Sequence, residues 1–249
     1  MHDSLPHPFS SEARAAEWWP GLQDPATPHG EVFASGNEAA GVALALALAL
    51  DRLRAAAPDA LDEVSDERAW LWVQDAGSLR LTGRPYRPGL PATLRHRLIH
   101  VAVKTPEDAL FALEEGLRCR DLAFVIGEIA GNPRALDFTA SRRLSLAAER
   151  HGTPLWLVRL DALRDLGSAR MRWDVHSAPS PSPRWNPEAP GTPSWRAELF
   201  RARNHPPGKW ILRHDADVLV AAKAAETAFV APDHGDLAAA SGDRPLAAR

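Results

Sequence analysis

Short apolar runs alternate with amphipathic stretches over the first two thirds of the chain, and this alternation predicts the fold. Five of the runs predict buried strands: 31–33, 69–73, 98–103, 122–129 and 154–158. The stretch 38–54 predicts a helix, because it is rich in alanine and leucine and β-branched residues are nearly missing. Strands and helices that alternate with short connections favour a parallel, twisted sheet with both faces covered.

Two further helices have clear end signals. Thr105 is expected as an N-cap, Pro106 follows at the first helical position, and two acids complement the helix dipole in the first turn. Residues 137–151 have an amphipathic pattern, and Gly152 is expected to end that helix at the C′ position.

The pattern changes after residue 168. Period-two alternation without intervening helices predicts antiparallel strands at 171–175, 195–200 and 209–213. Pro206-Pro207-Gly208 predicts the turn of a hairpin between the last two strands. The segment 177–194 contains six prolines and predicts an irregular loop. A short helix is expected from Val218 to Ala228.

These elements predict an α/β fold, namely a twisted and mainly parallel sheet flanked by helices, with antiparallel strands added near the C-terminus. We expect an extended segment at residues 1–27, in which Trp18 and Trp19 pack on the core or on a partner. A core domain is expected at 28–215. A tail at 216–249 is expected to be partly helical or disordered.

Composition is typical of a soluble globular protein, with 45% hydrophobic and 24% charged residues. The most apolar run, residues 39–50, is shorter than the roughly 20 residues that a membrane span needs. The first residues lack a basic region followed by an apolar one, so we expect a cytoplasmic protein without a membrane association. The one cysteine, Cys119, excludes an internal disulfide and a cysteine-based metal cluster.

Charge is unevenly distributed along the chain, although the net charge is only −3. Residues 1–80 carry 5 basic and 13 acidic side chains, whereas 134–172 carry 8 and 4, and 195–214 carry 5 and 1. This separation indicates an anionic partner for the basic half, either nucleic acid or an acidic protein surface, unless the arginines are simply solvated. Four arginines are the candidate contacts: Arg142, Arg143, Arg201 and Arg203.

Gly36 and Gly41 have the spacing of the phosphate-binding loop G-x-x-x-x-G-K-[ST], and they lie between an apolar run and a helix. In a working loop the lysine reaches the phosphates and the next hydroxyl holds Mg²⁺, but these positions are Val42 and Ala43 here. Glu38, inside the loop, would repel an anion. The glycines alone also fit an ordinary turn before a helix. In this context they predict a degenerate nucleotide site.

A second defect concerns the acid that completes the Mg²⁺ site of such enzymes at the end of the strand next to the loop-bearing strand. The candidate strand, 122–129, has Gly127 where that aspartate is expected, followed by Glu128 as a candidate base. Without lysine, hydroxyl and aspartate, little remains to hold a triphosphate, so we expect no cofactor and no catalysis.

Other catalytic arrangements are not supported. His96 and His100 are four residues apart, but they span a transition from loop to strand and have no third ligand nearby in sequence, so no metal site is expected. Ser35 beside Gly36 lacks the G-x-S-x-G frame of a hydrolase nucleophile.

Three segments look like parts of one known fold: 31–36 like the strand entering an ATP loop, 168–174 like a later core strand, and 196–210 like a basic hairpin. On these segments the chain resembles the RecA-like fold over roughly residues 28–215. Five segments are considered together: Glu31–Ala34, Trp72–Asp75, Tyr86–Leu90, Ala112–Cys119 and Leu136–Leu144. On these segments the chain resembles, more closely, the ImuA family of bacterial SOS mutagenesis proteins.

This resemblance implies a non-enzymatic accessory protein of error-prone translesion synthesis. It implies an ImuB-like Y-family polymerase homologue and an error-prone replicative-type DNA polymerase as partners, with RecA, direct DNA contact and self-association left open. The loop 159–167 departs from RecA because it has no aromatic residue to stack on a base. Two alternatives remain: an ATP-dependent recombinase-like enzyme whose neighbouring subunit supplies the lysine, and a SulA-like inhibitor of cell division.

Overall fold

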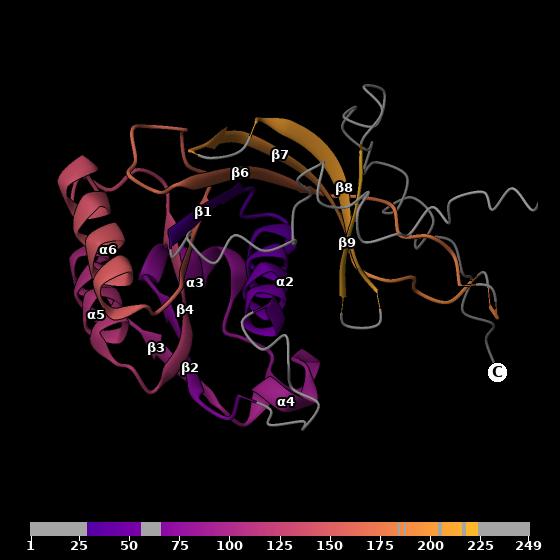
Figure 1. The fold of residues 1–249 in the computed structure, drawn as a ribbon, viewed down its shortest axis with the longest axis horizontal. Helices are drawn as coiled ribbons and strands as arrows, with labels where there is room; N and C mark the ends of the chain where they lie inside the picture. Colours follow the sequence, from indigo (N-terminus) through magenta and orange to yellow (C-terminus); the bar gives the residue numbers. More distant parts are fainter. Residues whose placement is uncertain are drawn as a thin grey trace, which may run out of the picture.

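The computed structural model describes residues 29–55, 66–183, 185–186, 188–203, 206–215 and 218–223 (Figure 1). The segment with Trp18 and Trp19 lies outside these residues. The helices are α2 (Ala40–Ala55), α3 (Ala76–Thr82), the 3₁₀ turn η1 (Arg87–Gly89), α4 (Ala92–Arg95), α5 (Pro106–Arg118) and α6 (Phe138–His151). The strands are β1 (His29–Ala34), β2 (Ala69–Gln74), β3 (Leu98–Ala102), β4 (Leu122–Ala130), β5 (Leu155–Leu160), β6 (Met171–Ser177), β7 (Ser194–Ala202), β8 (Gly208–Asp215) and β9 (Val218–Lys223).

The described strands form one sheet in the order β3-β2-β4-β5-β1-β6-β7-β8-β9. The first six strands in this order pair in parallel, and β7, β8 and β9 add to them in antiparallel fashion. The predicted α/β architecture is therefore confirmed. β6 was expected to be antiparallel throughout, but it pairs in parallel with β1 and antiparallel only with β7.

The helix ends follow the signals in the sequence. The Thr105 side chain accepts a hydrogen bond from the Asp108 N–H at the start of α5, and Asp137 caps α6 in the same way through the Ala140 N–H. Gly152 ends α6 with a φ of 71°, in the left-handed region that glycine adopts readily. These caps fix where α6 begins, and α6 forms one wall of the candidate site.

The predicted short helix from Val218 is wrong for the described residues 218–223, which form β9. Leu219 is buried and Val220 is exposed, so neighbouring residues face opposite sides as in a strand. Alanines after residue 220 suggested a helix, but pairing with β8 outweighs that local preference. The sheet thus continues to Lys223, beyond Asp215.

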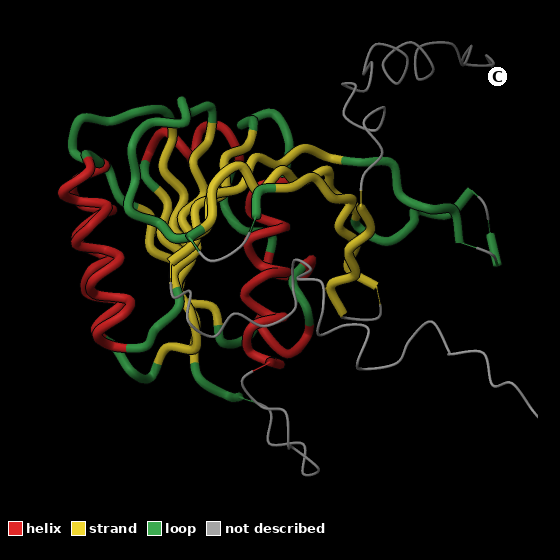
Figure 2. Tube along the Cα trace, turned by 45° about the horizontal axis from the view of Figure 1, so that its top comes forward, coloured by secondary structure: helices red, strands yellow, loops and turns green. Residues whose placement is uncertain are grey.

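Helices cover the two faces of the sheet differently (Figures 1 and 2). α2 packs on one face with a core that includes Trp70, Phe124 and Trp173, and α5 and α6 pack side by side on the other face over the parallel strands. The antiparallel strands curve past α2, so that β6 and β9 both contact it. Burial of these large aromatic side chains stabilises the packing of α2 on the sheet.

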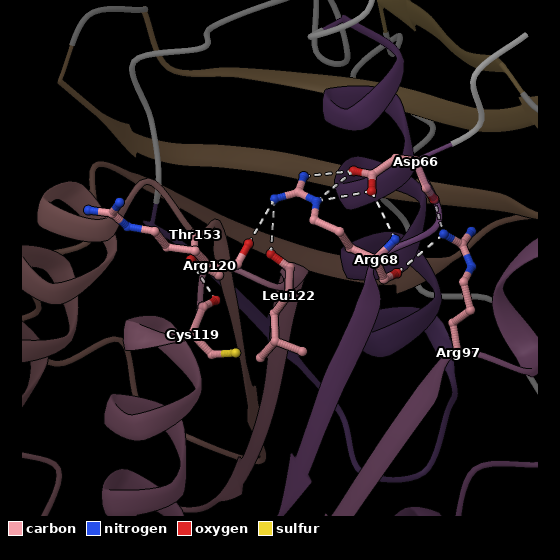
Figure 3. Close-up of polar contacts among 7 residues, drawn as sticks. All are labelled: Asp66, Arg68, Arg97, Cys119, Arg120, Leu122 and Thr153. Atoms are coloured by element: carbon pink, nitrogen blue, oxygen red, sulfur yellow. Dashed lines mark hydrogen bonds and ion pairs between the residues drawn. The ribbon is translucent and has the colours of Figure 1, made fainter.

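Arginines hold the amino ends of β2 and β4 together (Figure 3). Arg68 forms an ion pair with Asp66 at 2.7 Å and donates to the backbone carbonyls of Arg120 and Leu122. Arg97 donates to the carbonyls of Asp66 and Arg68. These guanidinium groups already have partners within the chain, so they stabilise the amino ends of the strands and are not candidates for binding a ligand.

None of the helices in the described part of the chain combines the length and the apolar character that crossing a lipid bilayer requires.

Candidate functional site

The glycine loop, residues 35–41, connects β1 to α2 as the spacing predicted. Its Gly36 N–H donates a hydrogen bond of 2.9 Å to the carboxylate of Asp161, the residue that follows β5. Asp161 has a φ of 50°, an uncommon value for a residue other than glycine. A side chain at Gly36 would lie 2.8 Å from both the Asp161 carboxylate and Leu81 of α3. An anion of the chain itself thus contacts the loop where a phosphate would be expected.

Glu38 brings a second carboxylate to the glycine loop, and it points toward β6. It accepts hydrogen bonds from the Ser177 N–H at 2.8 Å and from His176 Nδ1 at 3.3 Å. Partial burial by itself would raise the pKa of Glu38, but these hydrogen bonds outweigh the burial and lower the pKa below its ordinary value. Glu38 is therefore held as an anion beside the loop.

The positions of the missing lysine and hydroxyl belong to the protein core. Val42 and Ala43 are half-buried and pack against the apolar cluster under α2. A side chain at Gly41 would lie 2.7 Å from Ala34 Cβ and 3.0 Å from Val158 Cγ1, so glycine lets α2 approach the sheet closely. The start of α2 therefore packs closely on β1 and β5.

The relation between the glycine loop and the acidic strand differs from the expectation. β4 was expected beside the loop-bearing strand, but β5 lies between β4 and β1 in the sheet. Gly127 is not at the end of its strand, because β4 continues to Ala130. A side chain at Gly127 would lie 2.9 Å from Leu113 of α5, on the face that carries α5 and α6. Close packing against Leu113 therefore explains why residue 127 is glycine.

Glu128 points to the opposite face of β4 and is fully buried. Its carboxylate accepts hydrogen bonds from Trp72 Nε1 at 2.7 Å and from the Thr82 hydroxyl at 3.0 Å. Burial raises the pKa of Glu128, and hydrogen bonds from Thr82, Gln74 and Trp72 partly offset this effect. The carboxyl group is enclosed by β2 and α3, so its present partners are structural.

No group of three or more histidine, cysteine, aspartate or glutamate side chains within the described ranges is arranged to hold a metal ion. His100 Nε2 instead lies 2.8 Å from the amide oxygen of Gln74. Cys119 is exposed as a free thiol.

A groove of about 500 Å³ lies between α6, the segment after β5 and the end of β7. We call it the arginine groove. Its lining residues are Phe138, Arg142, Ser145, Leu146, Glu149, Gly167, Ser168, Ala169, Arg170, Arg201, Ala202 and Arg203. Three of the four arginines that the sequence singled out therefore meet in one place, although they come from segments about 60 residues apart in the chain.

The fourth candidate, Arg143, lies elsewhere. It turns toward α5 and donates from Nε to Glu114 at 2.8 Å, with an ion pair at the same distance. In contrast, Arg142, Arg201 and Arg203 form no ion pair with any described residue. Arg170 is paired with Glu149 at 2.9 Å. Of the two adjacent arginines on α6, Arg143 is therefore paired with an acid of α5, whereas Arg142 lines the groove without an ion pair among the described residues.

The floor of the groove is a chain of hydroxyl groups. Ser145 Oγ lies 2.7 Å from the Nδ1 atom of His29 and 2.6 Å from the Ser168 hydroxyl, which in turn lies 3.1 Å from the Ser141 hydroxyl. Burial, with the nearby Arg172, lowers the pKa of His29 from 6.5 to about 3, so the imidazole is neutral at pH 7. The neutral His29 thus contacts the Ser145 hydroxyl, one of the two serine hydroxyls that line the groove.

Most other arginines of the basic segments are paired inside the protein. Arg172 forms a buried ion pair with Glu31 at 2.6 Å and lies over the ring of Phe33, 4.9 Å from its centroid. Arg164 pairs with Asp174 and lies over the ring of Phe200. Arg159, also buried, lies 3.5 Å from Asp165. The charge count along the sequence therefore overstated the basic surface, and the groove brings together three arginines that have no ion pair among the described residues.

The sequence patterns did not single out Asp161, which contacts the glycine loop, or the residues that line the groove beside the three arginines. Asp161 directly follows an apolar strand, and polar residues at the carboxyl ends of parallel strands are common in sites. Phe138, Arg142 and Leu146 are spaced by four residues on α6, which places them on one helical face. The contact of α6 with the end of β7 depends on the tertiary fold.

Comparison with known proteins gives a relative for about half of the chain. A scan against protein-family models finds no match. Protein ImuA from two strains of Caulobacter vibrioides is 35% identical to this chain over 137 residues, which are 50% of this chain and 52% of the relative. The matched part thus spans about half the length of the curated relatives. The resemblance inferred from the sequence is confirmed over this part, in which the chain is similar to Protein ImuA.

Proposed function

We propose that this chain is a non-catalytic, RecA-like accessory protein of SOS-induced error-prone translesion synthesis, with a degenerate ATP site. The observation that carries the proposal is the contact of the Gly36 N–H with the carboxylate of Asp161. A nucleotide phosphate would have to displace this anion, and a hydrogen bond to a charged group contributes about 1.5–3 kcal/mol. The lysine and the hydroxyl that would favour that exchange are absent from the positions of Val42 and Ala43.

The enclosure of Glu128 supports the same proposal. A general base must reach the proton that it abstracts, directly or through one water. The Glu128 carboxylate is instead bonded to Trp72 and Thr82, and no part of the residue is exposed. Glu128 contributes to stability in this reading, and it takes no part in catalysis.

The partners that we propose follow from the ImuA relationship: an ImuB-like polymerase homologue first, then an error-prone replicative-type DNA polymerase and RecA. The arginine groove serves as a contact surface, because Arg142, Arg201 and Arg203 have no ion pair among the described residues. Arg143 belongs to the α5–α6 contact through Glu114, so it does not serve as a partner contact.

The test is complementation in a strain that lacks the gene for this chain. We expect DNA damage to induce fewer mutations in this strain, and we expect the wild-type chain to restore the normal frequency of induced mutations. The variants Val42→Ala and Glu128→Gln should restore it equally well, since neither position serves nucleotide chemistry. Copurification with the ImuB-like partner should be unchanged in both variants. Loss of mutagenesis in a folded Glu128→Gln variant would contradict the proposal.

The recombinase-like enzyme remains the second candidate, because Glu128 is an acid near the carboxyl end of a central strand. That candidate requires ATP turnover by the purified chain, removed by Glu128→Gln. The SulA-like inhibitor requires arrest of cell division on overexpression. We expect neither result.

A further inference from the structure

The arginine groove places three cationic groups in one concave surface. Arg142 comes from α6, Arg201 from the end of β7, and Arg203 directly follows β7. Among the described residues only Glu149 contributes an acid to the lining, and it pairs with Arg170. The groove therefore has an excess of positive charge, which suits an anionic ligand.

Hydroxyl groups extend this site inward. Ser145 and Ser168 line the groove, and their hydroxyls lie 2.6 Å apart. Phosphate oxygens are contacted in proteins mainly by arginine and lysine, and also by serine and threonine hydroxyls. A floor of fixed hydroxyls under guanidinium groups thus suits a phosphate group.

An aromatic side chain lies at the rim of the same groove. Phe138 is 49% exposed, and it lies one helical turn before Arg142. Leu146, 51% exposed, follows one turn after Arg142. An exposed ring beside unpaired arginines is the combination by which proteins bind single strands, since bases stack on the ring while cations contact the backbone.

We propose that the arginine groove binds single-stranded nucleic acid, with Arg142, Arg201 and Arg203 contacting phosphates and Phe138 stacking on a base. The inference deepens the contact role of the groove in the proposed function, and it does not depend on which polymerase the chain assists. A duplex keeps its bases paired and presents no free face to Phe138. An acidic peptide would use the arginines but would leave the ring without a specific role.

The experiment is fluorescence anisotropy of a labelled 20-nucleotide oligo(dT) with the purified full chain. Binding should saturate at low salt, and log K should fall linearly with log[salt]. The slope should become less steep by about 0.7 for each phosphate contact removed. We expect Arg142→Glu combined with Arg201→Glu to weaken binding at least tenfold at about 50 mM salt. Circular dichroism and thermal midpoints confirm that each variant is folded.

Two matched controls come from the chain itself. Arg143→Glu changes the charge by the same amount as Arg142→Glu alone, which should weaken binding measurably. Arg143 faces α5, so binding by Arg143→Glu should stay within about twofold of wild type. Phe138→Ala should weaken binding by about tenfold, as expected for one lost stacking contact. Phe111→Ala removes a ring that is 68% exposed on α5, outside the groove, and should leave the affinity unchanged.

Three results would overturn the proposal. The first is the absence of oligo(dT) binding by the wild-type chain at low salt. The second is an equal effect of Arg142→Glu and Arg143→Glu. The third is tighter binding of a poly-glutamate peptide with the same groove dependence, which would assign the groove to an acidic protein segment. Nucleotide binding and the ImuB-like partner are measured separately, so failure here leaves the degenerate ATP site untouched.

Discussion

The glycine loop and the arginine groove both offer hydrogen-bond donors to an anion, but their donors are satisfied to different degrees within the described residues. At the loop, Asp161 accepts from the Gly36 N–H, and Glu38 lies alongside. At the groove, Arg142 and Arg201 have no ion-pair partner among the described residues. The loop donor is therefore satisfied within the chain, whereas the groove keeps arginines that have no ion pair among the described residues.

The largest expected difference between the two regions concerns packing. Gly41→Val places methyl groups against Ala34 and Val158, both held by the sheet, and should lower the free energy of unfolding by about 3 kcal/mol. Chemical denaturation measures this loss. A Gly41→Val variant as stable as wild type would show that the start of α2 is loosely packed, and the loop would no longer count as part of the core.

Lowering the pH should reduce the free energy of unfolding through His29, whose imidazole contacts the Ser145 hydroxyl in the groove. The pKa of His29 is about 3 in the folded chain against 6.5 when unfolded, so the unfolded state binds more protons between these values. Stability is therefore fully present above pH 6.5 and falls with decreasing pH by up to about 1.4 kcal/mol per unit. Between pH 7 and pH 5 we expect a loss of about 2 kcal/mol from this group.

The variant His29→Asn keeps a polar partner for Ser145 without a group that titrates in this range. Its unfolding free energy should depend less on pH between 7 and 5 than that of wild type. Equal pH dependence of the two proteins would mean that His29 does not hold the groove floor as a neutral group.

Substitutions at Asp161 measure how much its hydrogen bond with the Gly36 N–H contributes to stability. Asp161→Ala removes the acceptor of the Gly36 N–H and should cost about 1–2 kcal/mol. Asp161→Asn keeps an acceptor and tolerates the positive φ, so it should stay close to wild type. If alanine and asparagine were equally stable at this position, the hydrogen bond would contribute nothing to the loop.

The smallest effects are expected at the exposed arginines. Arg142→Ala should change the unfolding free energy by less than about 0.5 kcal/mol, because its side chain has no ion pair to lose among the described residues. Arg143→Ala should cost about 0.5 kcal/mol through the loss of Glu114. A larger cost at Arg142 would reveal a structural role and weaken its assignment as a ligand contact.

The sequence predicted most of the elements, because each depends on local signals. Thr105, Asp137 and Gly152 set helix ends that the structure reproduces. β9 was missed because its alanines favour a helix locally, while its pairing with β8 is non-local. The position of β5 between β1 and β4 is likewise a property of the sheet order, which hydrophobic patterns do not encode.

The candidate site was predicted only in part, for a similar reason. The glycine spacing and the losses at Val42 and Ala43 are visible in the sequence, but the contact between Gly36 and Asp161 joins residues 125 positions apart. Charge counting found Arg142 and Arg201 together with arginines that are paired inside the fold, such as Arg172. Only the tertiary structure separates paired from unpaired guanidinium groups.

The central claim is that the glycine loop no longer holds a nucleotide, and calorimetric titration of the full chain with MgATP tests it most directly. The account predicts no saturable heat up to about 1 mM nucleotide, a limit that corresponds to a binding free energy of about −4 kcal/mol. The same result is expected with oligo(dT) present and in the Asp161→Ala variant. Micromolar binding by the wild-type chain would contradict the account and return the recombinase-like enzyme to first place.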